Sequence, residues 1–211
     1  MMSNPVSESP VIRNGTHKDY EGSKLGMWLF LFTEIILFGG LFILYSAYRS
    51  RYPGEFHQGG HELNTVIGIA NTVILITSSL MMAVSISAIK KGSRSLAIGC
   101  LSGTIALGAI FLFNKYIEWS GEIHHGLYPN SPELLQEPHG KQLFFGLYYS
   151  MTGLHGLHVC AGVVLLSVML GFVIRKKITS EDCNRLENAG LYWHLVDVIW
   201  IFLLPLFYLA A

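Results

Sequence analysis

The sequence predicts an all-α fold, an integral membrane bundle of five transmembrane helices. Hydrophobic residues make up 51% of the 211 residues and charged residues 13%, about half the charged share of ordinary soluble domains. The charges are confined to short clusters between five long apolar runs. Each run is as long as the roughly 20 residues that cross a bilayer, and a segment in lipid must satisfy its own backbone, so each run is predicted to be a helix.

The elements follow in chain order. Residues 1–24 are polar with no evident cleavable signal, so they are predicted to form a mobile tail ahead of one membrane domain, residues 25–211. Within it, helices are expected at about 25–48, 64–89, 95–118, 142–174 and 189–210. At about 1.5 Å per residue the fourth helix would reach about 50 Å, so it is expected to tilt or to project beyond the lipid.

The distribution of lysine and arginine predicts the orientation. With the N-terminus in the cytoplasm and the C-terminus outside, ten of the 14 basic residues lie inside and four outside. Cytoplasmic loops carry the excess of positive charge in membrane proteins. The four residues placed outside are Arg49, Arg51, Lys115 and Lys141.

The longest predicted connection is the outer loop 119–140. Its three histidines, His124, His125 and His139, are candidate metal ligands, but no ligand spacing recurs and an exposed polar loop is the favoured interpretation. The run 131–133, Ser-Pro-Glu, predicts the start of a short helix with Ser131 as its N-cap. The three cysteines have no paired spacing, so neither a disulfide framework nor a zinc motif is predicted.

Five ionisable residues are predicted inside the membrane at similar depth: Glu34, His155, His158, His194 and Asp197. On ideal helices Glu34 and Asp197 lie roughly 12–14 Å from the inner surface, and the first two histidines lie roughly 20–24 Å along a helix that enters from outside. All five can therefore share one layer in the inner half. Ionisable groups at this depth are costly unless something receives them.

Three interpretations of this layer remain open. Hydrogen bonding between helices is favoured, a proton relay or substrate path is second, and a metal or haem site is third. A haem with two histidine ligands would need His155 or His158 with His194, and the bulky Trp193 and Trp200 leave little room for it.

Each acidic residue in the membrane is expected to have a partner. Asp197 is predicted to bond to His155 or His158, which would fasten the last helix to the fourth. Glu34 is expected to be neutral or held by one of these histidines. Glu118, near the outer end of the third helix, is expected to be interfacial and to pair with Lys115 three residues earlier.

Small residues predict where the helices approach closely. Gly99 and Gly103 lie four apart on the third helix, and Gly153 and Gly156 flank His155. Polar side chains on the second helix, from Asn71 to Ser79, are expected to bond between helices. Both patterns are interpreted as packing features in preference to a cofactor site.

The chain resembles subunit III of the haem–copper respiratory oxidases. The resemblance rests on four motifs that, with Glu118, cover nearly all of the chain after residue 24: Phe-Thr-Glu-Ile-Ile-Leu-Phe at 32–38, Asn-Thr-Val-Ile-Leu-Ile-Thr-Ser-Ser at 71–79, Thr-Gly-Leu-His-Gly-Leu-His-Val at 152–159, and Glu187 followed by Tyr-Trp-His-Leu-Val-Asp-Val-Ile-Trp at 192–200. The chain departs from the seven-helix form in lacking the first two helices, as the five-helix bacterial forms do, and its loop 119–140 is long. Both electron donors, cytochrome c and quinol, remain open.

The resemblance implies a bundle that packs against catalytic subunit I, with subunit II and membrane lipids as further partners and no nucleic acid. It implies that this chain binds no haem or copper, which belong to the catalytic subunit, and that structural phospholipid fills a cleft between helices. Glu34 matches the intramembrane carboxylate that the family's carbodiimide labelling identifies.

The expected function is therefore that of a non-catalytic subunit of a proton-pumping terminal oxidase in the bacterial inner membrane. Such a subunit stabilises the catalytic subunit and supports proton uptake. Two alternatives remain: a small proton-coupled transporter that uses Glu34, His155 and Asp197, and a nitric-oxide-reductase accessory subunit of the same fold.

Overall fold

Five long helices run side by side in the computed structural model, which describes residues 20–180 and 182–209. They are α1 (Tyr20–Arg51), α3 (Thr65–Lys90), α4 (Arg94–His124), α5 (His139–Ile174) and α6 (Asn184–Leu204). The shorter elements are α2 (Pro53–Glu62), the 3-10 turn η1 (Leu134–Gln136) and the π-helical turn η2 (Pro205–Leu209). All five long helices are apolar enough to cross a membrane, and the described residues contain no strand. The predicted fold class is confirmed.

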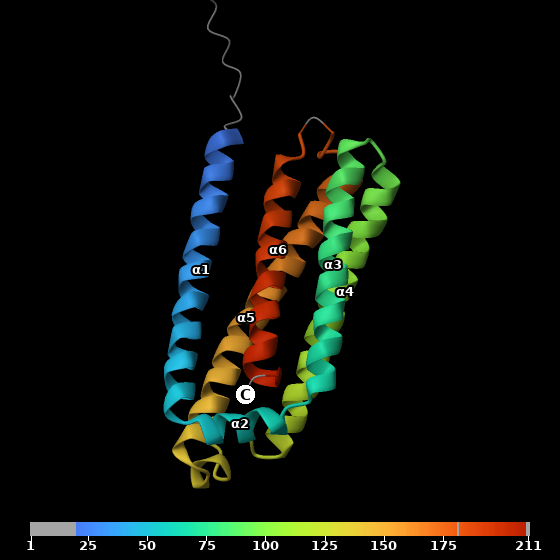
Figure 1. Cartoon of the computed structure of the whole chain (residues 1–211). Coiled ribbons are helices and arrows are strands. Elements are labelled where there is room, and N and C mark those ends of the chain that lie inside the picture. The colour runs from blue at the N-terminus through green and yellow to red at the C-terminus, as the bar shows by residue number, and fades with distance from the viewer. Residues whose placement is uncertain (1–19, 181, 210–211) are drawn as a thin grey trace, which may run out of the picture.

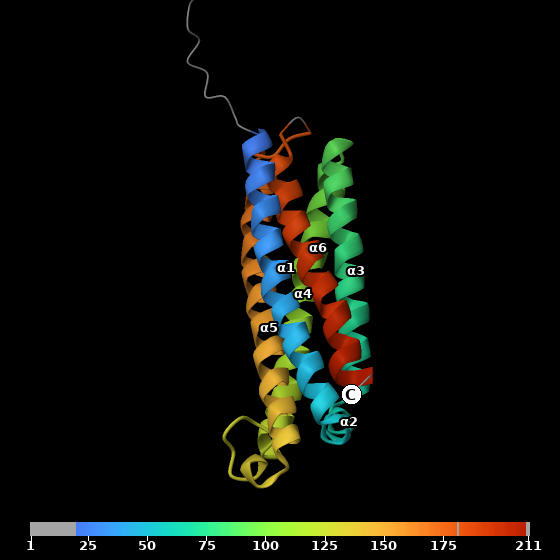
Figure 2. The same ribbon diagram turned by 60° about the vertical axis from the view of Figure 1, so that its left-hand side comes forward.

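The helices form a bundle in which α6 lies centrally and α1 stands at the edge (Figures 1 and 2). α6 contacts α1, α3 and α5, whereas α1 contacts α2, α5, α6 and, through Tyr45, the η2 turn. The start of α1, the α3–α4 turn and the α5–α6 loop lie at one end, called here the N-terminal end (Figure 1). The opposite end carries α2, the loop before α5 and η2, and is called the α2 end.

Helix boundaries follow local chemistry. Asn64 caps α3, because its side-chain oxygen accepts bonds from the backbone N–H groups of Val66 and Ile67 at 3.1 and 3.2 Å. The predicted helix after Ser131 is the single turn η1, and the hydroxyl of Ser131 accepts a bond from the backbone N–H of Leu134. α1 begins at Tyr20, so residues 20–24 of the predicted tail are helical, and residues 1–19 lie outside the described part of the chain.

The α2 helix was not predicted, although the sequence carries a signal for it. Pro53 occupies the first turn of α2, where a missing N–H does no harm. Phe56 is fully buried, with its ring centroid 5.3 Å from that of Tyr45 and 5.5 Å from that of Phe144. The packing of Phe56 against α1 and α5 therefore holds α2 across the end of the bundle.

An aromatic core holds α6 in place. Trp193 and Trp200 are fully buried, and the ring of Trp200 meets that of Phe111 edge-on at 4.8 Å. A Cβ added at Gly108 would lie 2.7 Å from the indole of Trp193, and one at Gly162 would lie 2.8 Å from it. These two glycines therefore make room for the tryptophan between α4 and α5.

The predicted small-residue seam is only partly correct. A side chain at Gly103 would meet Met81, and one at Gly153 would lie 3.2 Å from Trp119, as close packing requires. At Gly99 and Gly156 an added Cβ would meet nothing within 4 Å. The spacing of the glycines predicts that they lie on one face of their helix. It does not predict which side chain of a neighbouring helix each glycine contacts.

Candidate functional site

Glu34 of α1 and His158 of α5 form a side-chain hydrogen bond between the two helices within their apolar spans. The carboxyl Oε2 lies 2.9 Å from His158 Nε2, and the other ring nitrogen, Nδ1, lies 2.8 Å from the carbonyl oxygen of Leu154. The hydroxyl of Tyr192, on α6, donates to the carbonyl of His158 at 2.9 Å. Three helices therefore meet at this pair, and His158 is the expected histidine partner of Glu34.

The geometry determines how many protons the pair holds. A carbonyl oxygen only accepts, so Nδ1 of His158 carries a hydrogen and donates to Leu154. The short contact on the other side then requires one further proton between Nε2 and the Glu34 carboxyl. With that proton on oxygen both groups are neutral, and with it on nitrogen they form an ion pair. In either case the pair has no net charge, which suits its depth in the membrane.

His194 and its neighbours on α6 bond to hydroxyl groups of α3. Nδ1 of His194 lies 2.6 Å from the Ser79 hydroxyl. The indole N–H groups of Trp193 and Trp200 donate to the hydroxyls of Ser78 and Thr72, each at 3.0 Å. The expectation that polar residues of the second membrane helix bond between helices is confirmed at these positions.

The predicted bond between Asp197 and a histidine of α5 is wrong. Neither carboxyl oxygen of Asp197 makes a hydrogen bond of normal geometry in the described part of the chain, and its polar neighbour is the Ser79 hydroxyl of α3, although the residue is only 3% exposed. The two ring nitrogens of His155 also have none, and that ring packs between Phe111 and Trp200 at centroid distances of 5.5 and 5.2 Å. His158 turns toward α1 instead. The number of residues along a helix predicts how deep a side chain lies in the membrane. It does not predict which neighbouring helix the side chain faces.

A second polar cluster lies buried near the α2 end and is centred on Lys115 of α4. Its Nζ lies 3.0 Å from the Glu118 carboxyl, 2.9 Å from the Tyr148 hydroxyl and 3.0 Å from the Tyr208 hydroxyl. Tyr148 also donates to Glu122 at 3.0 Å, and Tyr208 donates to Glu118. The cluster joins α4, α5 and η2.

The predicted pairing of Glu118 with Lys115 is confirmed, and both side chains are buried inside the bundle. Glu118 is 6% exposed, and Glu122, assigned from sequence to the outer loop, is 7% exposed on an extended α4. Residues 115, 118 and 122 follow the spacing of one helix face, and this signal was available in the sequence. The tyrosines that cover this face come from distant parts of the chain.

Within the described part of the chain, the histidines predicted for the outer loop do not come together with further metal-ligating residues in a group of three or more. No group of three or more histidine, cysteine, aspartate or glutamate residues is placed to hold a metal ion within residues 20–180 and 182–209. His124 ends α4, and His139 begins α5 with its ring 6.0 Å from that of Tyr52.

Comparison with known proteins decides the family. The sequence matches the family described as cytochrome c oxidase subunit III over residues 3–211. It is 34% identical over 202 residues to cytochrome c oxidase subunit 3 of Synechocystis sp., an alignment that covers 95% of this chain and 81% of that protein. The chain belongs to the cytochrome c oxidase subunit III family.

This subunit III has relatives in oxidases named for different electron donors. It is 29% identical over 198 residues to cytochrome bo(3) ubiquinol oxidase subunit 3 of Pseudomonas putida, with 92% of this chain and 89% of that protein aligned. It is 27% identical to a heme-copper oxidase subunit I+III of Aeropyrum pernix over 87% of this chain and 22% of that longer protein. The chain is thus a multi-pass membrane subunit III of a terminal oxidase and associates with other oxidase subunits.

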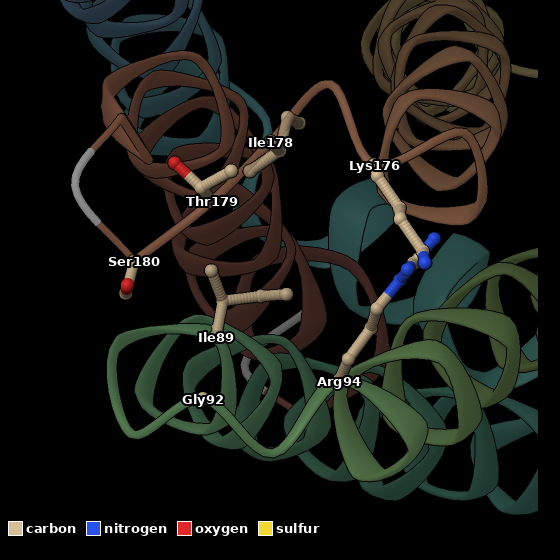
Figure 3. Close-up of a pocket in the computed structure, with 7 residues that line it drawn as sticks. All are labelled: Ile89, Gly92, Arg94, Lys176, Ile178, Thr179 and Ser180. Atoms are coloured by element: carbon tan, nitrogen blue, oxygen red, sulfur yellow. The ribbon is translucent and has the colours of Figure 1, made fainter.

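Positive charge gathers at the N-terminal end of this subunit III. Arg94 and Lys176 extend toward each other at a cavity of 220 Å³ between the α3–α4 turn and the α5–α6 loop (Figure 3). Arg94 also donates to the carbonyl of Ile174 at the end of α5, where the helix dipole favours a cation.

At the same end, Glu187 of α6 pairs with Lys90 of α3 at 2.8 Å and with Lys24 of α1 at 3.4 Å. One carboxylate therefore connects three helices at this end.

Because the carboxyl of Asp197 is buried and makes no hydrogen bond of normal geometry with the described residues, we expect Asp197→Leu to leave the melting temperature of the detergent-solubilised chain unchanged or to raise it. Leucine branches at the same carbon as aspartate, although it is larger, and it removes a poorly satisfied polar group whose burial costs about 1–3 kcal/mol. Ser78→Ala is the control, since Ser78 is also buried but its hydroxyl accepts a bond from Trp193 at 3.0 Å. That control should melt earlier. A lower melting temperature for Asp197→Leu would show that the carboxyl has a stabilising partner.

Proposed function

We propose that this chain is a non-catalytic subunit that packs against subunit I, contacts subunit II and stabilises the haem- and copper-bearing catalytic subunit during oxygen reduction to water. The match to the subunit III family over residues 3–211 carries this proposal. The relative that combines subunits I and III in one chain supports subunit I as the main partner. The described polar groups of the membrane layer support it too, because Glu34, His158 and His194 bond to neighbouring helices of the same chain.

Purification of the intact complex tests this proposal. The chain, carrying an affinity tag, should bring a haem protein with it from membranes in mild detergent. Deleting the chain should leave an oxidase that loses activity during turnover. Oxygen reduction or proton-coupled transport by the isolated chain would contradict the proposal, and transport would favour a transporter instead.

We also propose that the N-terminal end faces the cytoplasm of a bacterial inner membrane. The cations of that end, Lys24, Lys90, Lys91, Arg94, Arg175, Lys176, Lys177 and Arg185, outnumber those of the α2 end. The basic cavity of Figure 3 lies among them. This asymmetry is the one that orients membrane proteins.

For the lipid site, we propose that one acyl chain occupies a slot between α1 and α6. The slot has a volume of 340 Å³ and an entirely apolar lining that includes Phe38 and Phe42 of α1 and Phe202 of α6. Gly39 also lines it, and a Cβ added there would meet nothing within 4 Å. Open apolar space between two membrane helices is the kind of site that a lipid chain fills.

Filling the slot should displace that lipid. We expect Gly39→Phe to reduce the phospholipid that remains with the complex after delipidation, as measured by mass spectrometry, while the helices stay assembled. Gly40→Phe is the control, because Gly40 lies next in sequence and does not line the slot. Equal lipid retention in the two variants would argue against this site.

For Glu34 and His158, the proposed main role is to fasten α1, which has few other contacts. The pair also holds one exchangeable proton, and this supports a contribution to proton uptake by the catalytic subunit. The fastening role is preferred because His158 is also held by Leu154 and, through its backbone, by Tyr192, which fixes the ring in place. Glu34→Gln and Glu34→Ala separate the two roles.

A further inference from the structure

Two exposed histidines on α2 face each other across one turn of the helix. His57 and His61 lie four residues apart, and their Nε2 atoms are 3.2 Å from each other. Their ring centroids are 4.5 Å apart and the ring planes are nearly perpendicular, at 81°. Both side chains therefore direct the same nitrogen toward one point on the outer surface of the helix.

The separation of the two nitrogens matches that of two ligands on one metal ion. With zinc–nitrogen bonds of about 2.0–2.1 Å, tetrahedral coordination sets ligand nitrogens about 3.3–3.4 Å apart, and a right angle at the metal sets them about 2.8–3.0 Å apart. The observed 3.2 Å lies between these values. A metal can thus replace the hydrogen bond between the rings with only a small movement of either side chain.

The helix that carries the histidines is firmly held. On its opposite side Phe56 is buried between Tyr45 and Phe144, and Gly59 lies directly against the ring of Phe144. Because the backbone is fixed, the two rings are arranged before a ligand arrives, and little ordering is needed on binding. α2 ends at Glu62, so both imidazoles lie in its last two turns, where the helix dipole favours a cation.

We propose that His57 and His61 form a binding site for one divalent transition-metal cation at the α2 end, with water completing the coordination. Imidazole nitrogens select zinc and copper over magnesium or calcium, and copper(II) should bind more tightly than zinc. Binding through both Nε2 atoms requires each ring to carry its remaining hydrogen on Nδ1. The exposed donor ring reaches this tautomer by exchanging protons with water. The bound metal holds the last two turns of α2 together where α2 connects α1 to α3.

Calorimetric titration of the full chain in detergent micelles with zinc chloride tests the site, with an affinity tag that contains no histidine. We expect about one site per chain at neutral pH, and affinity that falls at least about tenfold in His57→Gln and in His61→Gln, since each removes one ligand. Affinity should also fall as the pH drops below about 6, because protonated imidazole cannot ligate. Copper(II) should give a paramagnetic resonance spectrum with coupling to imidazole nitrogen.

His124→Gln and His125→Gln are the controls. These exposed histidines are adjacent in sequence and so do not face each other on a helix. Both controls should retain the zinc site with unchanged affinity. Zinc binding that survives in the double variant His57→Gln/His61→Gln, or that is lost in either control, would overturn the proposal. Circular dichroism verifies that the variants fold, which is expected because both substituted side chains of α2 are exposed.

Discussion

Lys115→Met is expected to lower the stability of the bundle by about 3–5 kcal/mol, because it leaves two buried carboxyl groups without their cation. Lys115 is 7% exposed and contacts Glu118, Tyr148 and Tyr208 within 3.0 Å. Methionine has a similar shape, so the expected loss reflects charge and hydrogen bonding more than packing. Thermal unfolding of the detergent-solubilised chain measures the effect.

The loss should be largely reversed when the carboxyl groups are neutralised as well. The triple variant Lys115→Met/Glu118→Gln/Glu122→Gln keeps the side-chain sizes and removes the unpaired charges, so its stability should return toward that of the parent chain. Lys141→Met is the control. Lys141 is as buried as Lys115, but its partners Glu62 and Glu137 have side chains that are 35% and 42% exposed, so water can solvate their carboxylates when the lysine is removed and the expected loss is smaller. Equal losses for the two lysines would contradict a special role for the buried cluster.

Glu34→Ala is expected to weaken the attachment of α1 to the bundle by about 1–3 kcal/mol, since it leaves Nε2 of His158 without a partner inside the membrane. Glu34→Gln should have little effect on assembly, because its amide donates to the same nitrogen while Nδ1 of His158 still donates to Leu154. Co-purification of the oxidase subunits and thermal unfolding of the complex measure both variants.

Turnover of the intact complex separates fastening from proton delivery. Glutamine cannot exchange the proton that the carboxyl shares with His158. If the pair only fastens α1, Glu34→Gln should sustain normal oxidase turnover even at alkaline pH, where protons are scarce. Slower turnover at alkaline pH in a fully assembled complex would show that the proton of this pair contributes to uptake. Thr33→Ala is the control, because the Thr33 hydroxyl bonds to the carbonyl of Phe30 in its own helix.

The sequence by itself determined the fold class and the five membrane spans. Transmembrane helices are specified locally, because each segment must be apolar and must satisfy its own backbone hydrogen bonds. The rise per residue of an α-helix predicted that Glu34 and His158 lie at similar depth, and the two side chains do meet. Lys115 and Glu118 are separated by about one helical turn, which predicted their pairing. The family resemblance rests on motifs of consecutive residues, which can be recognised without knowledge of the tertiary structure.

Only the tertiary structure decided which polar side chains meet. Depth along a helix is set by residue count, but the direction of a side chain depends on how each helix is rotated against its neighbours. For this reason His158 bonds to Glu34, whereas His155 packs between aromatic rings and Asp197 lacks the expected histidine. The burial of Glu118 and Glu122 likewise depends on Tyr148 and Tyr208, which approach from α5 and from the π-helical turn after Pro205. These contacts join residues far apart in the chain, so no local pattern specifies them.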